Sequence, residues 1–88
     1  MITGKTASGF DFEIEDDALD DMELLDALVE IDNGRADQVS TVCVRLLGKA
    51  QRARLYEHLR GENGRVRATD VSAAILEILG AVSDGKKS

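Results

Sequence analysis

Residues 16–32 read DDALDDMELLDALVEID, an acidic stretch whose apolar residues recur at helical spacing. One apolar stripe of the predicted helix consists of Ala18, Met22, Leu25 and Val29. A second stripe beside it consists of Leu24, Leu28 and Ile31. With successive residues about 100° apart, the two stripes form an apolar arc roughly 180° wide. A single packing neighbour seldom covers such an arc. This helix is therefore either packed on two sides or offers one stripe to another molecule.

Both ends of this helix carry recognisable signals. It is expected to begin near Asp16 or Asp17, because an aspartate side chain can accept from the exposed N–H groups of a first turn. The many carboxylates in its first turns suit the positive end of the helix dipole. Asn33-Gly34 supplies the turn that ends it.

The residues before this helix predict a β-hairpin. Phe10, Phe12 and Ile14 alternate with acidic residues, which is the period of a half-buried strand. A short first strand around residues 2–6 is expected to precede a turn at residues 7–9. Two strands alone are marginal in water, so we expect Phe10 and Phe12 to anchor the hairpin against the helices.

Three more helices are predicted after the acidic one. Residues 36–47 and 49–60 form two of them, and Gly48 breaks the chain between them. Thr69 or Asp70 is expected to cap the last helix. Its buried stripe consists of Val71, Ala74, Ile75, Ile78 and Val82. The predicted fold is mainly α, a small bundle of about four helices with a short N-terminal β-hairpin.

The chain of 88 residues is expected to form one domain with a thin core. Residues 1–82 make up this helical domain, with the hairpin in residues 1–15 and the helices in residues 16–82. Residues 83–88 lack apolar side chains and are expected to be a flexible tail. No secretion signal is visible, and no apolar run approaches the roughly 18 residues of a membrane span. No contact with a membrane is therefore expected.

The charge is unevenly distributed along the chain. Residues 1–32 carry eleven acidic residues and one basic residue, a net charge of −10. Residues 45–67 carry seven basic and two acidic residues, a net charge of +5. Such a dipole can be satisfied within one molecule, between copies of the chain, or by a charged partner.

The chain is poor in residues that carry chemistry. It has one histidine and one cysteine, and no cluster of unlike titratable groups. His58 is predicted to face solvent, and Cys43 lies within an apolar stripe, where it is expected to act as a small buried hydrophobe. The predicted protein is therefore not an enzyme, and neither a cofactor nor a metal site is expected.

Three segments carry a resemblance to a known family. They read SGFDFEIEDDALDDMELLDALVEID (residues 8–32), VRLLGKAQRARLYEHLRGENGRV (44–66) and ATDVSAAILEIL (68–79). The sequence of these segments resembles the small tail assembly chaperones of long-tailed, non-contractile (siphovirus-type) bacteriophages and prophages of Gram-positive bacteria. The similarity is strongest in residues 20–25 and 47–60.

The resemblance implies a non-enzymatic, mostly helical protein that acts during tail morphogenesis. Such a protein binds and solubilises the tape measure protein and helps to recruit major tail tube protein subunits around it. It acts in the cytoplasm of the infected or lysogenic bacterial host and is absent from the mature virion.

Two groups of residues are candidates for contact with a partner. Leu24, Leu28 and Ile31 are expected to contribute to a client or self-association surface. The basic residues Arg45, Arg52 and Arg54 are expected to meet the acidic helix of a second copy in a homo-oligomer. The alternative interpretation is a small nucleic-acid-binding or regulatory protein that uses the basic surface of residues 45–67. The acidic first third would repel a duplex, so no nucleic acid partner is expected.

Overall fold

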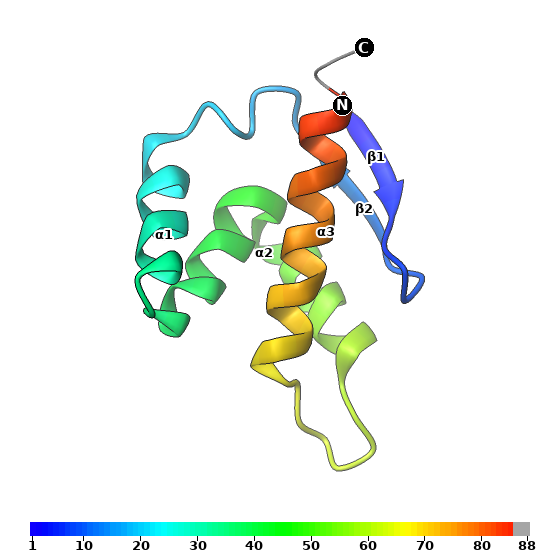
Figure 1. Cartoon of the computed structure of the whole chain (residues 1–88). Helices are drawn as coiled ribbons and strands as arrows, with labels where there is room; N and C mark the ends of the chain where they lie inside the picture. The colour runs from blue at the N-terminus through cyan, green and yellow to red at the C-terminus, as the bar shows by residue number, and fades with distance from the viewer. Residues whose placement is uncertain (86–88) are drawn as a thin grey trace.

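The computed structural model describes residues 1–85 of the chain. Two strands, β1 (Ile2–Lys5) and β2 (Asp11–Ile14), form an antiparallel hairpin. The helices that follow are α1 (Met22–Asp32), the short 3₁₀ turn η1 (Ala36–Gln38), α2 (Val39–Leu59) and α3 (Ala68–Gly85). Figure 1 shows the hairpin on one side of the molecule and α1 on the other, with α2 and α3 between them. The predicted mainly α fold with an N-terminal hairpin is confirmed.

The hairpin forms where the alternating pattern predicts it. Ile2 pairs with Ile14 and Lys5 with Asp11, and the N–H of Gly9 donates to the Thr6 carbonyl at 2.9 Å to close the turn. Phe10, Phe12 and Ile14 are buried against the helices. Their burial offsets the marginal stability of an isolated pair of strands.

The helix α1 begins later than the sequence predicts, at Met22 and not near Asp16 or Asp17. Asp21 is its N-cap, and the Asp21 carboxylate accepts from the N–H groups of Glu23 (3.0 Å) and Leu24 (3.2 Å). Residues 16–19 instead form a turn in the segment that leads the chain from the hairpin to α1. Aspartates at several successive positions can all act as caps, so the tertiary path decides which one is used.

The predicted break at Gly48 is confirmed, and it lies inside α2 as a single residue with φ 82° and ψ 164°. The two helices predicted on either side of it are the two halves of α2, so residues 1–85 form three α-helices where about four are expected. The predicted helix from residue 36 starts as the 3₁₀ turn η1. Only glycine adopts the backbone angles of Gly48 without strain.

The side chain of Gln51 connects the second half of α2 to the hairpin. Its carboxamide nitrogen donates to the Glu13 carbonyl (2.7 Å) and to the Leu47 carbonyl (2.9 Å). Its carboxamide oxygen accepts from the Glu13 N–H at 2.8 Å. Gln51 thus pairs with the free edge of β2 and at the same time spans the break at Gly48.

The last helix is longer than predicted at both ends. It begins at Ala68, so Thr69 and Asp70 lie in its first turn and do not precede it. It ends at Gly85, so residues 83–85, which the sequence assigns to the tail, have helical backbone. Residues 86–88 of the predicted tail lie outside the described residues.

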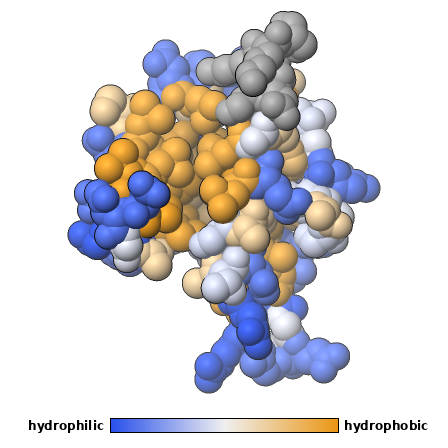
Figure 2. Space-filling model, in the orientation of Figure 1, coloured by the Kyte–Doolittle hydropathy of each residue, from blue (hydrophilic) through white to orange (hydrophobic). Residues whose placement is uncertain are grey.

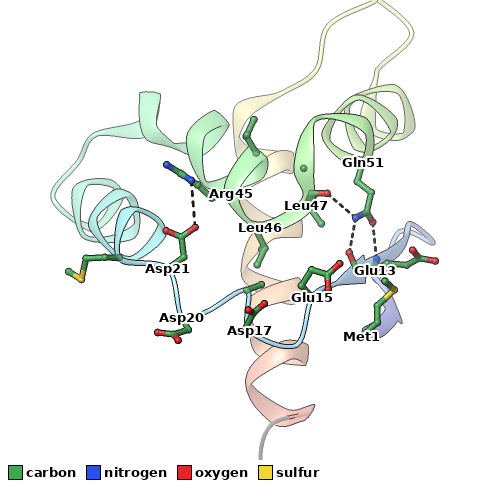
Figure 3. A pocket seen from close by; sticks show the side chains of 14 residues that line it. Met1, Glu13, Glu15, Asp17, Asp20, Asp21, Arg45, Leu46, Leu47 and Gln51 are labelled. Carbon is green, nitrogen blue, oxygen red and sulfur yellow. Dashed lines mark hydrogen bonds and ion pairs between the residues drawn. The ribbon is translucent and has the colours of Figure 1, made fainter.

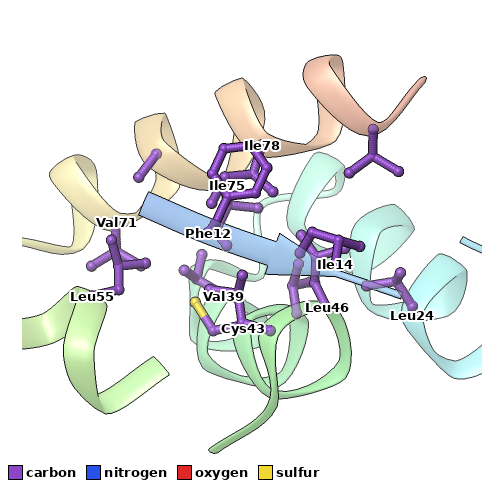
Figure 4. Packing of buried hydrophobic residues seen from close by; sticks show 14 of the residues in the cluster. Phe12, Ile14, Leu24, Val39, Cys43, Leu46, Leu55, Val71, Ile75 and Ile78 are labelled. Atoms are coloured by element: carbon purple, nitrogen blue, oxygen red, sulfur yellow. The ribbon is translucent and has the colours of Figure 1, made fainter. Parts of the chain in front are cut away.

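A single core joins all of these elements. Figure 4 shows Phe12 and Ile14 of β2 between side chains of α3, among them Ile75 and Ile78, and side chains of α2. Leu24 of α1 completes the core at one end. The predicted stripe of α3 is buried as expected, and Val66 of the preceding loop packs against the core.

The angles at Gly48 predict the effect of replacing it. A Cβ at position 48 meets no atom within 4 Å, so the cost of Gly48→Ala comes from backbone strain alone. We expect Gly48→Ala to lower the free energy of unfolding by about 1–3 kcal/mol, measured by urea denaturation.

Gly80 is exposed within α3 and is equally open around its Cβ position, so Gly80→Ala is the matched control. We expect it to raise stability by about 0.5–1 kcal/mol. Equal effects of the two substitutions would contradict this interpretation of the break.

Candidate functional site

The two apolar stripes of α1 have opposite positions relative to the core. Leu24 is 0 % exposed, and Ala27 is also buried. Met22, Leu25 and Val29 are 68 %, 43 % and 57 % exposed. We refer to these three residues as the α1 stripe. They are the exposed large apolar residues of α1, and the part of the chain that the structure describes has only two others, Met1 and Leu76.

The structure contradicts the sequence-based placement of Leu24 on a partner-binding surface, because its side chain lies wholly inside the core. Leu28 and Ile31 are half-buried and pack against the same core. The sequence shows both stripes, and Ala27 was the signal that separates them. A small residue between Leu24 and Leu28 allows the close approach of α1 to α2 that buries this side.

Apolar surface gathers on one face of the molecule. Figure 2 shows it over α1 and over the space between α1 and α3. Half-buried side chains of both helices, including Leu28 and Leu79, pack against the core from their respective helices. The exposed α1 stripe therefore belongs to a helix whose apolar side is only partly covered by the chain itself.

An open cleft of about 760 Å³ lies at the N-terminal end of the α1 stripe. Met22 lines it together with residues of the hairpin, of the segment that enters α1, and of the first half of α2. Five carboxylates surround it, as Figure 3 shows: Glu13, Glu15, Asp17, Asp20 and Asp21. A neighbouring hollow between α1 and the start of α2 is lined by Glu23, Asp26 and Glu30. The stripe thus has negative charge at one end and along one side.

Two positive groups lie beside this cleft, and both are paired. The N-terminal amine of Met1 is 2.7 Å from the Asp16 carboxylate, and this contact raises the pKa of the amine. Arg45 of α2 pairs with Glu23 and lies 3.9 Å from the Asp21 carboxylate. By contrast, Asp17, Asp20 and Asp26 form no ion pair with any residue of the described part of the chain.

The three predicted basic contact residues do not form one surface. Arg45 contacts α1, whereas Arg52 donates to the Ser40 hydroxyl at 2.9 Å and lies over the Tyr56 ring. Arg54 lies over the Phe10 ring, 5.4 Å from its centroid, at the hairpin. Part of the charge asymmetry seen in the sequence is therefore satisfied inside one molecule, through Arg45.

The histidine and the cysteine lie in different environments. His58 is exposed as predicted, and its ring lies within hydrogen-bonding distance of the Ser8 hydroxyl (3.2 Å) and the Ser8 carbonyl (3.1 Å). Cys43 is buried as predicted, and burial raises the pKa of its thiol to about 11. Among residues 1–85, no group of three His, Cys, Asp or Glu side chains is arranged to hold a metal ion. The described helices include none that is long and apolar enough to cross a membrane.

The burial of Cys43 predicts slow reaction with alkylating reagents. Because the thiolate is the reactive form and the thiol pKa is about 11, we expect native protein at pH 8 to react with iodoacetamide far more slowly than urea-unfolded protein. Mass spectrometry measures the alkylation. Rapid labelling of the native protein would show that the thiol is accessible.

The raised pKa of the Cys43 thiol also predicts how stability depends on pH. The folded state keeps the proton that the unfolded state loses, so the free energy of unfolding is expected to fall as the pH rises from about 9 towards 11.

Truncation of the adjacent residues Leu24 and Leu25 is expected to lower the free energy of unfolding by different amounts. Leu24→Ala removes a fully buried side chain and is expected to cost about 2–5 kcal/mol in urea denaturation. Leu25→Ala removes a side chain that is 43 % exposed and is expected to cost less than about 1 kcal/mol. A larger loss for Leu25→Ala would mean that the two stripes of α1 are assigned the wrong way round.

The chain matches no protein family, no curated protein and no solved structure to which it was compared.

Proposed function

We propose that this protein is a tail assembly chaperone of a siphovirus-type bacteriophage or prophage, and that it binds and solubilises the tape measure protein. The sequence resemblance supplies the identity of the client. The observation that carries the proposal is the α1 stripe, because three large apolar side chains stand exposed on one helix of a small acidic protein.

A chaperone for a long, aggregation-prone client has two physical requirements. It needs exposed apolar surface to cover apolar surface of the client, since an exposed apolar patch on a small protein commonly marks a contact site. It also needs net charge to keep the complex in solution. The α1 stripe supplies the first requirement, and the net charge of −6 supplies the second.

The proposal includes a role for the charge in the assembly order. The net negative charge of each bound copy would keep loaded clients apart until subunits of the major tail tube protein replace the chaperone. The protein would then act in the bacterial cytoplasm and leave before the virion is complete. In this role the protein would perform no chemical step.

Co-expression with the client tests the proposal. The client would be a long helical tape measure protein, which we expect to be encoded downstream of this gene, and the readouts are its soluble fraction and its co-purification with the tagged chaperone. We expect the double substitution Leu25→Asp, Val29→Asp to reduce co-purification at least tenfold, because charge on the stripe prevents apolar contact. Circular dichroism and the urea midpoint should remain close to those of the wild type, since Leu25 and Val29 are 43 % and 57 % exposed and neither packs in the buried core.

The matched control is Leu76→Asp, which introduces the same charge at an apolar residue of α3 that is 68 % exposed. It should leave co-purification unchanged. Retention of the client by the folded Leu25→Asp, Val29→Asp variant would overturn the proposal, as would a gene neighbourhood that encodes no tape measure protein.

A further inference from the structure

We propose that the α1 stripe docks one amphipathic helix whose apolar residues are bordered by lysine or arginine. The inference rests on the proposed function and adds to it the chemical character of the client segment. The occupant is a helix of two or three turns, apolar along one stripe and basic along one side and at one end.

The shape of the exposed surface favours a helix as the occupant. Met22, Leu25 and Val29 follow one another at steps of three and four, so they form a ridge along α1. Ridges of this kind pack against the grooves of a second helix, which is how amphipathic helices are recognised by helical proteins. The ridge extends over the eight residues from Met22 to Val29, or about 10 Å of helix axis, which matches roughly two turns of a partner.

The negative charge around the α1 stripe favours a basic partner helix. Asp20 adjoins Met22 at the cleft, and Asp26 follows Leu25 on the exposed side of α1. Neither carboxylate forms an ion pair with another described residue, so both are free to meet cations of a partner. Positive groups placed at the cleft and beside Asp26 would complement this potential, whereas negative groups would be repelled.

A second copy of the chain fits this surface less well. Two α1 stripes packed against each other would bring the acidic residues that border the stripe of one copy close to those of the other. The basic residues of α2 do not offer a matching apolar ridge, because the exposed large apolar residues outside α1 are Met1 and Leu76 among the described residues. A basic partner helix satisfies both the apolar ridge and the charge.

Binding of two synthetic peptides tests the inference directly. Both peptides have about 18 residues and one leucine stripe at helical spacing. One carries lysine beside and after the stripe, and the other carries glutamate at the same positions. We expect the lysine peptide to bind at least tenfold more tightly in titrations followed by amide NMR shifts. The shifts should centre on the α1 stripe, and the preference should shrink as salt is raised from 0.05 to 0.5 M.

Charge-matched variants locate the contact. Asp20→Asn, Asp26→Asn should reduce the preference for the lysine peptide severalfold, whereas Asp11→Asn, Glu62→Gln removes two charges elsewhere and should leave it unchanged. Equal binding of both peptides, binding of neither at millimolar concentration, or shifts centred on residues 60–67 would overturn the inference. Stripe shifts that depend only on protein concentration would assign the surface to a second copy and would also overturn it.

The client assay separates this inference from the proposed function. If the Asp20→Asn, Asp26→Asn variant retains the tape measure protein as fully as the wild type, the basic helix is wrong while the chaperone function stands. If Leu25→Asp, Val29→Asp also retains it, the chaperone function itself is wrong.

Discussion

The backbone of Glu13 faces α2 and not a third strand, and the carboxamide of Gln51 pairs with it on that side. A two-stranded sheet leaves the polar groups of each outer edge without a partner strand, and such groups are costly when they are covered without a hydrogen bond. Gln51 removes this cost at the edge of β2 that lies against α2. The remaining packing depends on this contact, because it holds β2 where Phe12 and Ile14 can enter the core between α2 and α3.

The break at Gly48 follows from the same requirement. The first half of α2 packs against α1, and the second half carries Gln51 to the hairpin. A straight helix has one direction, so a single unbroken helix would have to serve both contacts along one axis. The left-handed backbone at Gly48 gives the two halves separate directions, while the contact between Gln51 and the Leu47 carbonyl spans the break.

The sequence predicts features that depend on local chemistry and fails where the tertiary arrangement decides. The hairpin, the break at Gly48 and the burial of Cys43 follow from alternation, glycine and apolar spacing. The start of α1 was misplaced because Asp16, Asp17 and Asp21 have the same capping chemistry, and only the path from the hairpin selects Asp21. The exposed stripe was misassigned because both stripes of α1 are equally apolar. Which one meets α2 depends on the rotation of the helix about its own axis, for which the small residue Ala27 was the local signal.

The carboxylates around the α1 stripe also bear on the colloidal behaviour of the protein. At low ionic strength they keep the stripes of two copies apart, since like charges repel over a Debye length of about 10 Å at 0.1 M salt. Added salt shortens this repulsion and lets apolar surfaces meet, but it equally weakens attraction to any basic partner. Ionic strength would therefore act in opposite directions on self-contact and on contact with the proposed basic helix. Under that proposal, the acidic residues between Glu13 and Glu30 would set a range of salt concentration in which the stripe neither binds a second copy nor releases its partner.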